Sequence, residues 1–218
     1  WVGIKNFTFL FRSPDSWIII RNTILYNIVF IFLGTAFSVF IAILLNECSR
    51  KWQKRYQTLI LIPHLLSYVV VSYIAYAFLG AENGMINNQI LRPLGLDPIS
   101  FYTEDKYWPF ILVFVNIWKT FGYSSIIYFA SIIGIDRTYY EAAEVDGASA
   151  WTQIWSITLP LLKPVLITML LLSVGRILYS DFGLFYQVPM DSGMLFNTTN
   201  TIDTFVYRGL LQTNDLGR

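Results

Sequence analysis

Four long apolar stretches constrain this chain more than any other feature of its sequence. They cover residues 24–45, 58–79, 107–133 and 161–180. About 20 predominantly apolar residues in a helix cross the hydrocarbon core of a bilayer. Because lipid offers no partner for backbone polar groups, such segments must bond those groups within a helix. The sequence therefore predicts an all-α membrane protein with four visible spans.

Composition agrees with a membrane location. The 218 residues are 55% hydrophobic and only 13% charged, against about a quarter charged in soluble domains. The formal net charge of +1 gives no support for nucleic-acid binding. The single Cys48 has no internal disulfide partner and no neighbouring thiols at metal-ligand spacing. The spans also show neither a His-Glu-x-x-His metal site nor a Ser or Cys nucleophile with a nearby His, which argues against an intramembrane enzyme. No metal site and no catalytic residues are therefore predicted, and the chain is not expected to be an enzyme.

The loop of residues 46–57 orients the spans. It carries Arg50, Lys51, Lys54 and Arg55 against one acid, Glu47. By the positive-inside rule this loop is expected on the cytoplasmic side.

The other connections then follow in alternation along the chain. Residues 80–106 are expected outside as a folded loop, residues 135–160 inside, and residues 181–218 outside as a polar, turn-rich loop. Because the chain starts at Trp1 and its first span must begin outside, about six helices are implied. We interpret residues 1–218 as a fragment of one transmembrane domain that lacks the first and last helices.

Residues 135–164 form the most informative connection. Thr138 and Glu141 have the spacing of a capping box, so a short helix is expected to start there. Gly147 supplies the permissive backbone for a turn, and residues 148–158 predict a second short helix. Pro160 and Pro164 are expected to end that helix.

The first short helix offers small and acidic side chains together. Ala142 and Ala143 would let another backbone approach, while Glu141, Glu144 and Asp146 supply negative charge. A docking surface for a soluble partner is one interpretation. An ordinary helical loop between two spans is the other, and the residues alone leave both open.

A family resemblance distinguishes them. The run Glu141-Ala142-Ala143, followed by Gly147 and by Ile157, Leu159 and Pro160, resembles the EAA loop of ABC importer permeases. The wider string, from Glu141 through Asp146-Gly147-Ala148 to Leu159-Pro160-Leu161-Leu162-Lys163-Pro164, is similar to the carbohydrate branch that includes maltose and glycerol-phosphate permeases. In the tail, residues 181–189 and 201–204 resemble the polysaccharide permeases.

The resemblance implies a type I ABC importer permease in the inner membrane of a prokaryote, crossing it several times. The first helix of such a loop is a coupling helix that sits in a cleft of the ATPase subunit. Carried over, this assigns docking to Glu141, Ala142, Ala143, Asp146 and Gly147. The implied partners are a second permease subunit in a heterodimer, two ATPase subunits, an extracytoplasmic solute-binding protein and membrane lipid.

The energy source is expected to lie outside this chain. No Gly-x-x-x-x-Gly-Lys-Ser/Thr string occurs in it, so it lacks the loop that cradles ATP phosphates. No cofactor is predicted for the chain itself, and ATP and Mg²⁺ are expected at the partner ATPase.

Two intramembrane cations are candidates for the solute pathway. Lys119 lies near the middle of the third span with Asn116 and Tyr123, and Arg176 lies near Tyr179 at the outer end of the fourth. Charge inside a membrane indicates function by default, although Arg176 could instead snorkel to the interface. Two cations in one cavity would favour an acidic oligosaccharide.

A secondary transporter driven by an ion gradient is the main alternative. Such a protein would need intramembrane carboxylates or broken helices, and the first three stretches contain no Asp or Glu. His64 follows Pro63 in the second stretch, where either a packed histidine or a proton relay can be imagined.

Overall fold

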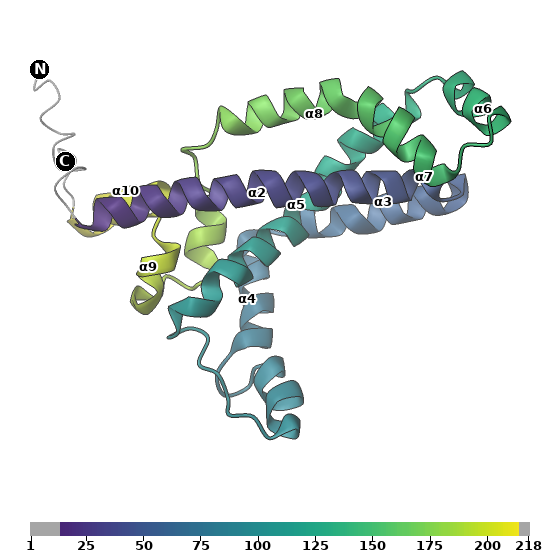
Figure 1. The fold of residues 1–218 in the computed structure, drawn as a ribbon. Helices are drawn as coiled ribbons and strands as arrows, with labels where there is room; N and C mark the ends of the chain where they lie inside the picture. The colour runs from purple at the N-terminus through teal and green to yellow at the C-terminus, as the bar shows by residue number, and fades with distance from the viewer. Residues whose placement is uncertain (1–13, 214–218) are drawn as a thin grey trace, which may run out of the picture. The chain divides into compact units, whose positions relative to one another are not determined.

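The computed structural model describes residues 14–213 (Figure 1), and this part of the chain is helical without a strand. The longer helices are α2 (Pro14–Glu47), α3 (Arg50–Leu65), α4 (Tyr68–Leu79), α5 (Trp108–Ile133), α6 (Arg137–Val145), α8 (Leu159–Val174) and α10 (Ile202–Arg208). Shorter turns of helix are η1 (Ile86–Leu91), η2 (Arg92–Leu94), η3 (Asp105–Tyr107), α7 (Ala150–Gln153), η4 (Ile154–Thr158), η5 (Gly183–Gln187), η6 (Gly193–Leu195), α9 (Phe196–Thr199) and η7 (Gly209–Thr213). The predicted all-α class is confirmed.

Three helical runs within the described chain are long and apolar enough to cross a membrane. They are Asp15–Glu47, Asp105–Ile133 and Ala150–Val174, and the α3–α4 pair is a fourth if it is one broken span. The second predicted stretch is thus interrupted, and this break was not predicted. Pro63 lies inside α3, whereas the break falls at Leu66 and Ser67. Ser67 then caps α4 by accepting a hydrogen bond from Val70 N–H.

The fourth span begins earlier and ends earlier than predicted. Residues 148–158 do not form a separate short helix, because α7 and η4 continue directly into α8. The prolines do not end the run: Pro160 lies in the first turn of α8, where a missing N–H is tolerated, and Pro164 lies inside the helix. A wide π turn precedes them, in which Leu159 N–H bonds to Ile154 O. The helix stops at Val174, six residues short of the predicted end.

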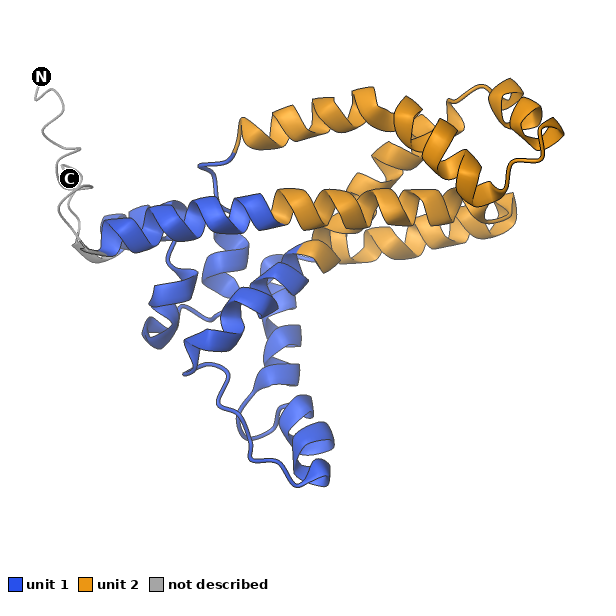
Figure 2. Cartoon of the chain, viewed as in Figure 1, with its two compact units in different colours: residues 1–29, 66–116, 177–218 blue, residues 30–65, 117–176 orange. Residues whose placement is uncertain are grey.

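The chain divides into two compact units (Figure 2). Unit 1 holds residues 1–29, 66–116 and 177–218, and unit 2 holds residues 30–65 and 117–176. The tail predicted as a loop is instead part of the folded body of unit 1. Leu184, Phe185, Val188 and Leu195 are buried there, so these apolar side chains hold the tail in place.

Polar ties also hold the tail within unit 1. Asn22 of α2 donates from Nδ2 to the carbonyl oxygens of Asn197 and Asn200, each at 3.0 Å. The loop of residues 80–106 is folded, as predicted. Its Asn87 is fully buried, donates to Ile99 O at 2.9 Å and accepts from Ile99 N at 2.9 Å.

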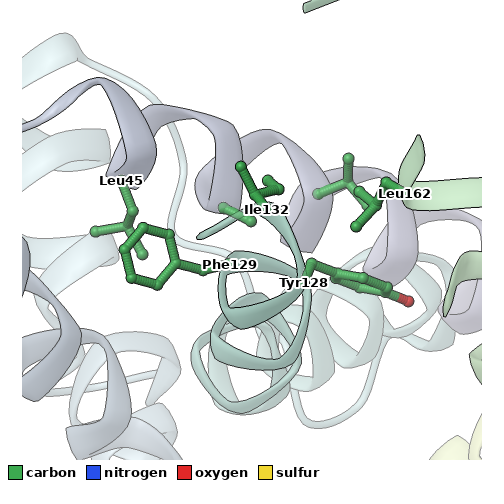
Figure 3. Close-up of a cluster of buried hydrophobic side chains, with 7 residues drawn as sticks. Leu45, Tyr128, Phe129, Ile132 and Leu162 are labelled. Atoms are coloured by element: carbon green, nitrogen blue, oxygen red, sulfur yellow. The ribbon is translucent and has the colours of Figure 1, made fainter. Parts of the chain in front are cut away.

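Unit 2 has a core of buried hydrophobic side chains (Figure 3). The core joins three helices through Val39, Ala42 and Leu45 of α2, Tyr128, Phe129 and Ile132 of α5, and Leu162 of α8. Ile60 of α3 packs against the same cluster. This core couples the ends of four helices mechanically, because close-packed side chains transmit displacement with little compression.

Candidate functional site

The helix α6 carries the residues that sequence analysis assigned to docking. It begins at Asp136 rather than at the predicted Thr138, and the Asp136 side chain accepts a hydrogen bond from Thr138 N–H at 3.0 Å. That backbone N–H lowers the pKa of the Asp136 carboxyl, because it stabilises the carboxylate. Asp caps a helix as well as Thr does. Because Asp136 has the extended backbone of an N-cap residue, the helix begins there.

A tight turn ends α6, and Gly147 supplies it as predicted. Ala148 N–H bonds to Ala143 O at 2.8 Å, and Gly147 N–H bonds to Glu144 O at 3.0 Å. This pair of bonds is a Schellman motif, which needs a left-handed residue just beyond the helix. Gly147 adopts φ +76°. Because Gly147 adopts the left-handed conformation that this motif requires, the helix ends just before it.

One face of α6 borders a cavity of about 740 Å³ within unit 2. Arg137, Tyr140, Glu141 and Glu144 are on this face, at the i, i+3, i+4, i+7 spacing of one helix side. The rest of the lining comes from Asn46, Glu47, Cys48, Ser49, Arg50, Gln53, Ile132, Ile133, Ile135, Ala150, Gln153, Ile154 and Thr158. The cavity therefore brings the basic loop after α2 together with the acidic side of α6.

The remaining α6 side chains do not line that cavity. Tyr139, Ala142, Val145 and Asp146 are all exposed, and Val145 has 88% of its surface accessible. No residue of α6 is buried. An amphipathic helix normally covers its apolar side. Of the five residues predicted to dock, Glu141 is on the cavity face, Ala142 and Asp146 are on the outward face, Ala143 is half-buried and Gly147 forms the turn.

The cavity face of α6 is anchored to the spans. Tyr140 Oη and Thr158 Oγ1 lie 3.0 Å apart in a hydrogen bond, and Thr158 is buried. Thr158 belongs to η4, which continues into α8 and so reaches Leu162 in the core. Ile132, at the other end of the connection, lies in the same core (Figure 3). A displacement of α6 would therefore act on α5 and α8 together.

Lys119 of α5 has a different environment from the one expected of a pathway residue. Only 7% of its surface is accessible. Its Nζ donates to His64 O at 3.0 Å and to Pro63 O at 3.4 Å. These carbonyls belong to the last turn of α3, where backbone oxygens have no partner within the helix. A cation at this end also complements the helix dipole.

Two further contacts join the same face of α5 to the end of α3. A Cβ on Gly122 would lie 1.8 Å from Ile60 O, so the two backbones approach as closely as glycine permits. Tyr123 stacks on His64 with ring centroids 4.9 Å apart and an interplanar angle of 13°. We call Lys119, Gly122 and Tyr123 the α5 clamp. Sequence analysis missed Gly122, although small residues at helix contacts in membranes are a known signal.

The other pathway candidates are more accessible than Lys119. Asn116 is half-buried and Tyr123 is 53% accessible, whereas Arg176 and Tyr179 are exposed. Arg176 follows the end of α8, in a turn where its N–H bonds to Ser173 O at 3.1 Å. His64 is exposed and stacked on Tyr123 rather than packed in a core.

The tail residues that carried the polysaccharide resemblance have structural partners within unit 1. Asp181 accepts a hydrogen bond from Tyr68 Oη at 2.7 Å. Asp203 accepts from Ser180 N–H at 2.6 Å and from the Ser180 hydroxyl. Thr201 and Thr204 form the capping box that starts α10. Among residues 14–213, no group of three His, Cys, Asp or Glu could hold a metal ion.

These features define a multi-pass helical membrane protein with an exposed, capped helix attached to its span core. The chain belongs to the family described as the binding-protein-dependent transport system inner membrane component, whose model matches residues 7–180. Its location in the cytoplasmic membrane follows from that family and agrees with the prediction.

Curated relatives include transport permeases for carbohydrates. The chain is 34% identical over 213 residues to the polygalacturonan/rhamnogalacturonan transport system permease protein YteP of Bacillus subtilis, covering 95% of this chain and 64% of that protein. It is 29% identical over 209 residues to the lactose transport system permease protein LacF of Rhizobium radiobacter, covering 94% of this chain and 68% of that one. The chain thus spans less than two thirds of the length of YteP.

A solved structure confirms the fold. A crystal structure of a bacterial ABC transporter involved in the import of the acidic polysaccharide alginate matches with a TM-score of 0.91 and 33% identity. The match covers 98% of this chain and 74% of that one. The predicted resemblance to carbohydrate ABC importer permeases is therefore confirmed.

Proposed function

We propose that this chain is part of the membrane-spanning permease subunit of an ATP-driven importer, and that it moves an oligosaccharide into the cell. In this proposal residues 1–218 belong to one transmembrane domain, and α6 is the helix that docks in the ATPase. The observation that carries the proposal is α6 itself, which ends in a rigid turn, exposes Val145, and is anchored to the span core through Tyr140.

The outward face of α6 suits a protein partner. Ala142 is small enough for close approach, Val145 offers apolar area, and Asp146 gives a charge at the rim. Exposed apolar area rimmed by polar groups is typical of an interaction site. Glu141 acts from the other face, where it lines the cavity with Arg50 and Arg137. Its role in docking is then to hold the position of α6 rather than to touch the ATPase.

The motion passes from α6 to the spans through unit 2. When ATP draws two ATPase subunits together, each would displace the α6 that it holds. The Tyr140–Thr158 bond and the core around Ile132 carry this displacement into α8 and α5. Packed helices of this kind respond by rigid-body movement rather than by local bending.

An acidic oligosaccharide is the cargo that we propose. Support comes from the relatives, because polygalacturonan and alginate are named for YteP and for the solved transporter. The two intramembrane cations give less support for an acidic cargo, because the Lys119 ammonium donates to two carbonyls. We keep Asn116, Tyr123, Arg176 and Tyr179 as pathway candidates. Lys119 then affects the pathway indirectly, by holding the end of α3 against α5.

Four kinds of partner complete the proposed machine. They are a second permease subunit in a heterodimer, two ATPase subunits that bind ATP and Mg²⁺, an extracytoplasmic binding protein, and membrane lipid. The binding protein is supported by a solved alginate transporter that contains an alginate pentasaccharide-bound periplasmic protein and matches with a TM-score of 0.90.

Docking is tested with a charge on the outward face of α6. Val145→Asp changes a side chain that is 88% accessible, so folding should be unaffected. Leu94→Asp is the matched control, because Leu94 is 68% accessible and lies in η2 of unit 1. The assembled transporter is purified through the permease, and retained ATPase subunit and ATP hydrolysis are measured.

The proposal predicts that Val145→Asp loses ATPase retention while Leu94→Asp keeps it. Equal retention in both variants would remove α6 from the docking interface. Uptake into proteoliposomes then tests the energy source and the cargo. Uptake of oligogalacturonate should need ATP inside the vesicle, and it should exceed uptake of a neutral oligosaccharide of equal length. Uptake driven by a Na⁺ or H⁺ gradient without ATP would favour the secondary-transporter alternative.

A further inference from the structure

The outward side of α3 carries a basic groove of about 580 Å³ within unit 2. Its lining is Arg50, Lys51, Lys54, Arg55, Thr58 and Leu59. These positions repeat every four residues along two adjacent rows, so they form one continuous side of the helix. Gln53 and Ile60 lie on the other side, toward the cavity and the core respectively. We call this lining the α3 groove.

The four cations of the α3 groove are exposed and lack acidic partners. Within residues 14–213, no carboxylate lies at ion-pair distance from any of them. Arg50 and Lys54, and likewise Lys51 and Arg55, are i, i+4 pairs of like charge, which repel each other on a helix. Glu47 is the nearest acid in sequence and lines the cavity, which Arg50 borders as well, whereas Lys51, Lys54 and Arg55 do not. The groove therefore holds a concentrated positive charge that an anion would neutralise.

The α3 groove changes character along its length. Its N-terminal part is cationic. Its C-terminal part, Thr58 and Leu59, is the start of the apolar stretch of residues 58–79. Arg55 lies over the Trp52 ring at 4.9 Å, and Trp52 stacks on Tyr56 with centroids 5.9 Å apart. Exposed Trp and Tyr next to a span mark the level of the lipid headgroups. The cations are thus placed where phosphates of a bilayer lie.

We propose that the α3 groove binds the phosphate of an anionic membrane lipid, with an acyl chain lying along Leu59. Clusters of Lys and Arg at the cytoplasmic end of a span attract anionic headgroups. A free phosphate would be satisfied by the cationic end alone, whereas a lipid also uses the apolar end. The gradient from Arg50 to Leu59 therefore favours the lipid over a soluble anion.

Lipid retention by the assembled transporter tests this site. The wild type, Lys54→Gln/Arg55→Gln and the control Arg92→Gln/Lys106→Gln are purified from mixed phosphatidylglycerol and phosphatidylcholine. The control removes the same charge from two exposed cations outside the groove. Retained lipids are counted by native mass spectrometry. Each cation near an anionic surface contributes about fivefold, so the groove variant should lose phosphatidylglycerol preference by roughly 25-fold.

Four outcomes decide the proposal. Loss of phosphatidylglycerol preference in the groove variant, with the control at the wild-type value, supports it. Unchanged preference in the groove variant overturns it. Displacement of the lipid by millimolar inorganic phosphate identifies a soluble-anion site, and loss of the ATPase subunit from the groove variant identifies a protein interface; either result overturns the lipid assignment.

Discussion

Lys119→Met separates two explanations of the intramembrane lysine. Methionine keeps a long, unbranched side chain of similar reach but removes the ammonium. If Lys119 holds the end of α3, the variant leaves the Pro63 and His64 carbonyls without that donor. The end of α3, just before the break at Leu66 and Ser67, would then lose a contact that holds it in place. If Lys119 instead binds an acidic solute, the fold should be indifferent to the change.

The expected magnitude follows from two opposing contributions. Each hydrogen bond from a charged donor stabilises by about 1.5–3 kcal/mol, so the two bonds contribute roughly 3–6 kcal/mol. Removing a lysine from the middle of a membrane helix recovers about 2.5–3.5 kcal/mol of desolvation. From the middle of each range, the net destabilisation is about 1.5 kcal/mol, which corresponds to a fall of about 3 to 6 °C in the unfolding midpoint.

Thermal unfolding of the purified transporter measures this effect. Lys163→Met is the control, because Lys163 is exposed and the chemical change is the same. Lys119→Gln keeps an N–H donor, so its unfolding midpoint should lie between those of Lys119→Met and the wild type. In Lys119→Met, uptake of acidic and neutral sugars should fall together. An unchanged midpoint in Lys119→Met, with a raised KM for the acidic sugar alone, would refute the clamp and restore Lys119 to the solute path.

Three other tests address a close contact, a turn and a helix cap. Gly122→Ala should prevent normal packing, because its Cβ would meet Ile60 O at 1.8 Å, whereas Gly34→Ala meets nothing within 4 Å and should keep the wild-type unfolding midpoint. Gly147→Ala places an L residue at φ +76°, at a cost of about 1–2 kcal/mol, and should lower transport-coupled ATP hydrolysis without an atomic clash. The Asp136 cap has a pKa below its ordinary value of 3.8, so its contribution to α6 is complete above that pH and is lost as the pH falls through the lowered value. Hydrogen exchange of α6 amides should show this loss in the wild type but not in Asp136→Asn, whose cap does not titrate.

The apolar stretches determined the spans well but not their ends. Three of the four predicted spans correspond to helices of span length. The break in the second was not predicted: Pro63 is tolerated inside α3, and the interruption falls at Leu66 and Ser67. Lys119 donates to carbonyls at the end of α3 from another helix. That donor is more than fifty residues away in sequence, so no local pattern could indicate it.

The motif proposed to dock was likewise only partly predictable from local sequence. Gly147 was predictable as a turn because only a permissive residue suits a left-handed position. Which side of α6 each motif residue occupies was not predictable, since that depends on the loop after α2 and on Thr158. Glu141, for example, lines the cavity. The folded tail of unit 1 was missed for a related reason: its backbone carbonyls at Asn197 and Asn200 accept hydrogen bonds from Asn22 of α2, which is distant in sequence.

The sequence by itself determined the membrane class, the number of apolar stretches, the family and the turn at Gly147. Each of these depends on local composition or on short spacing. Only the tertiary structure decided that Lys119 holds the end of α3, that Gly122 brings two backbones together, and that the tail is part of a folded unit. These outcomes depend on which distant groups become neighbours, and in a membrane an unpaired buried carbonyl or ammonium is costly enough to decide that choice.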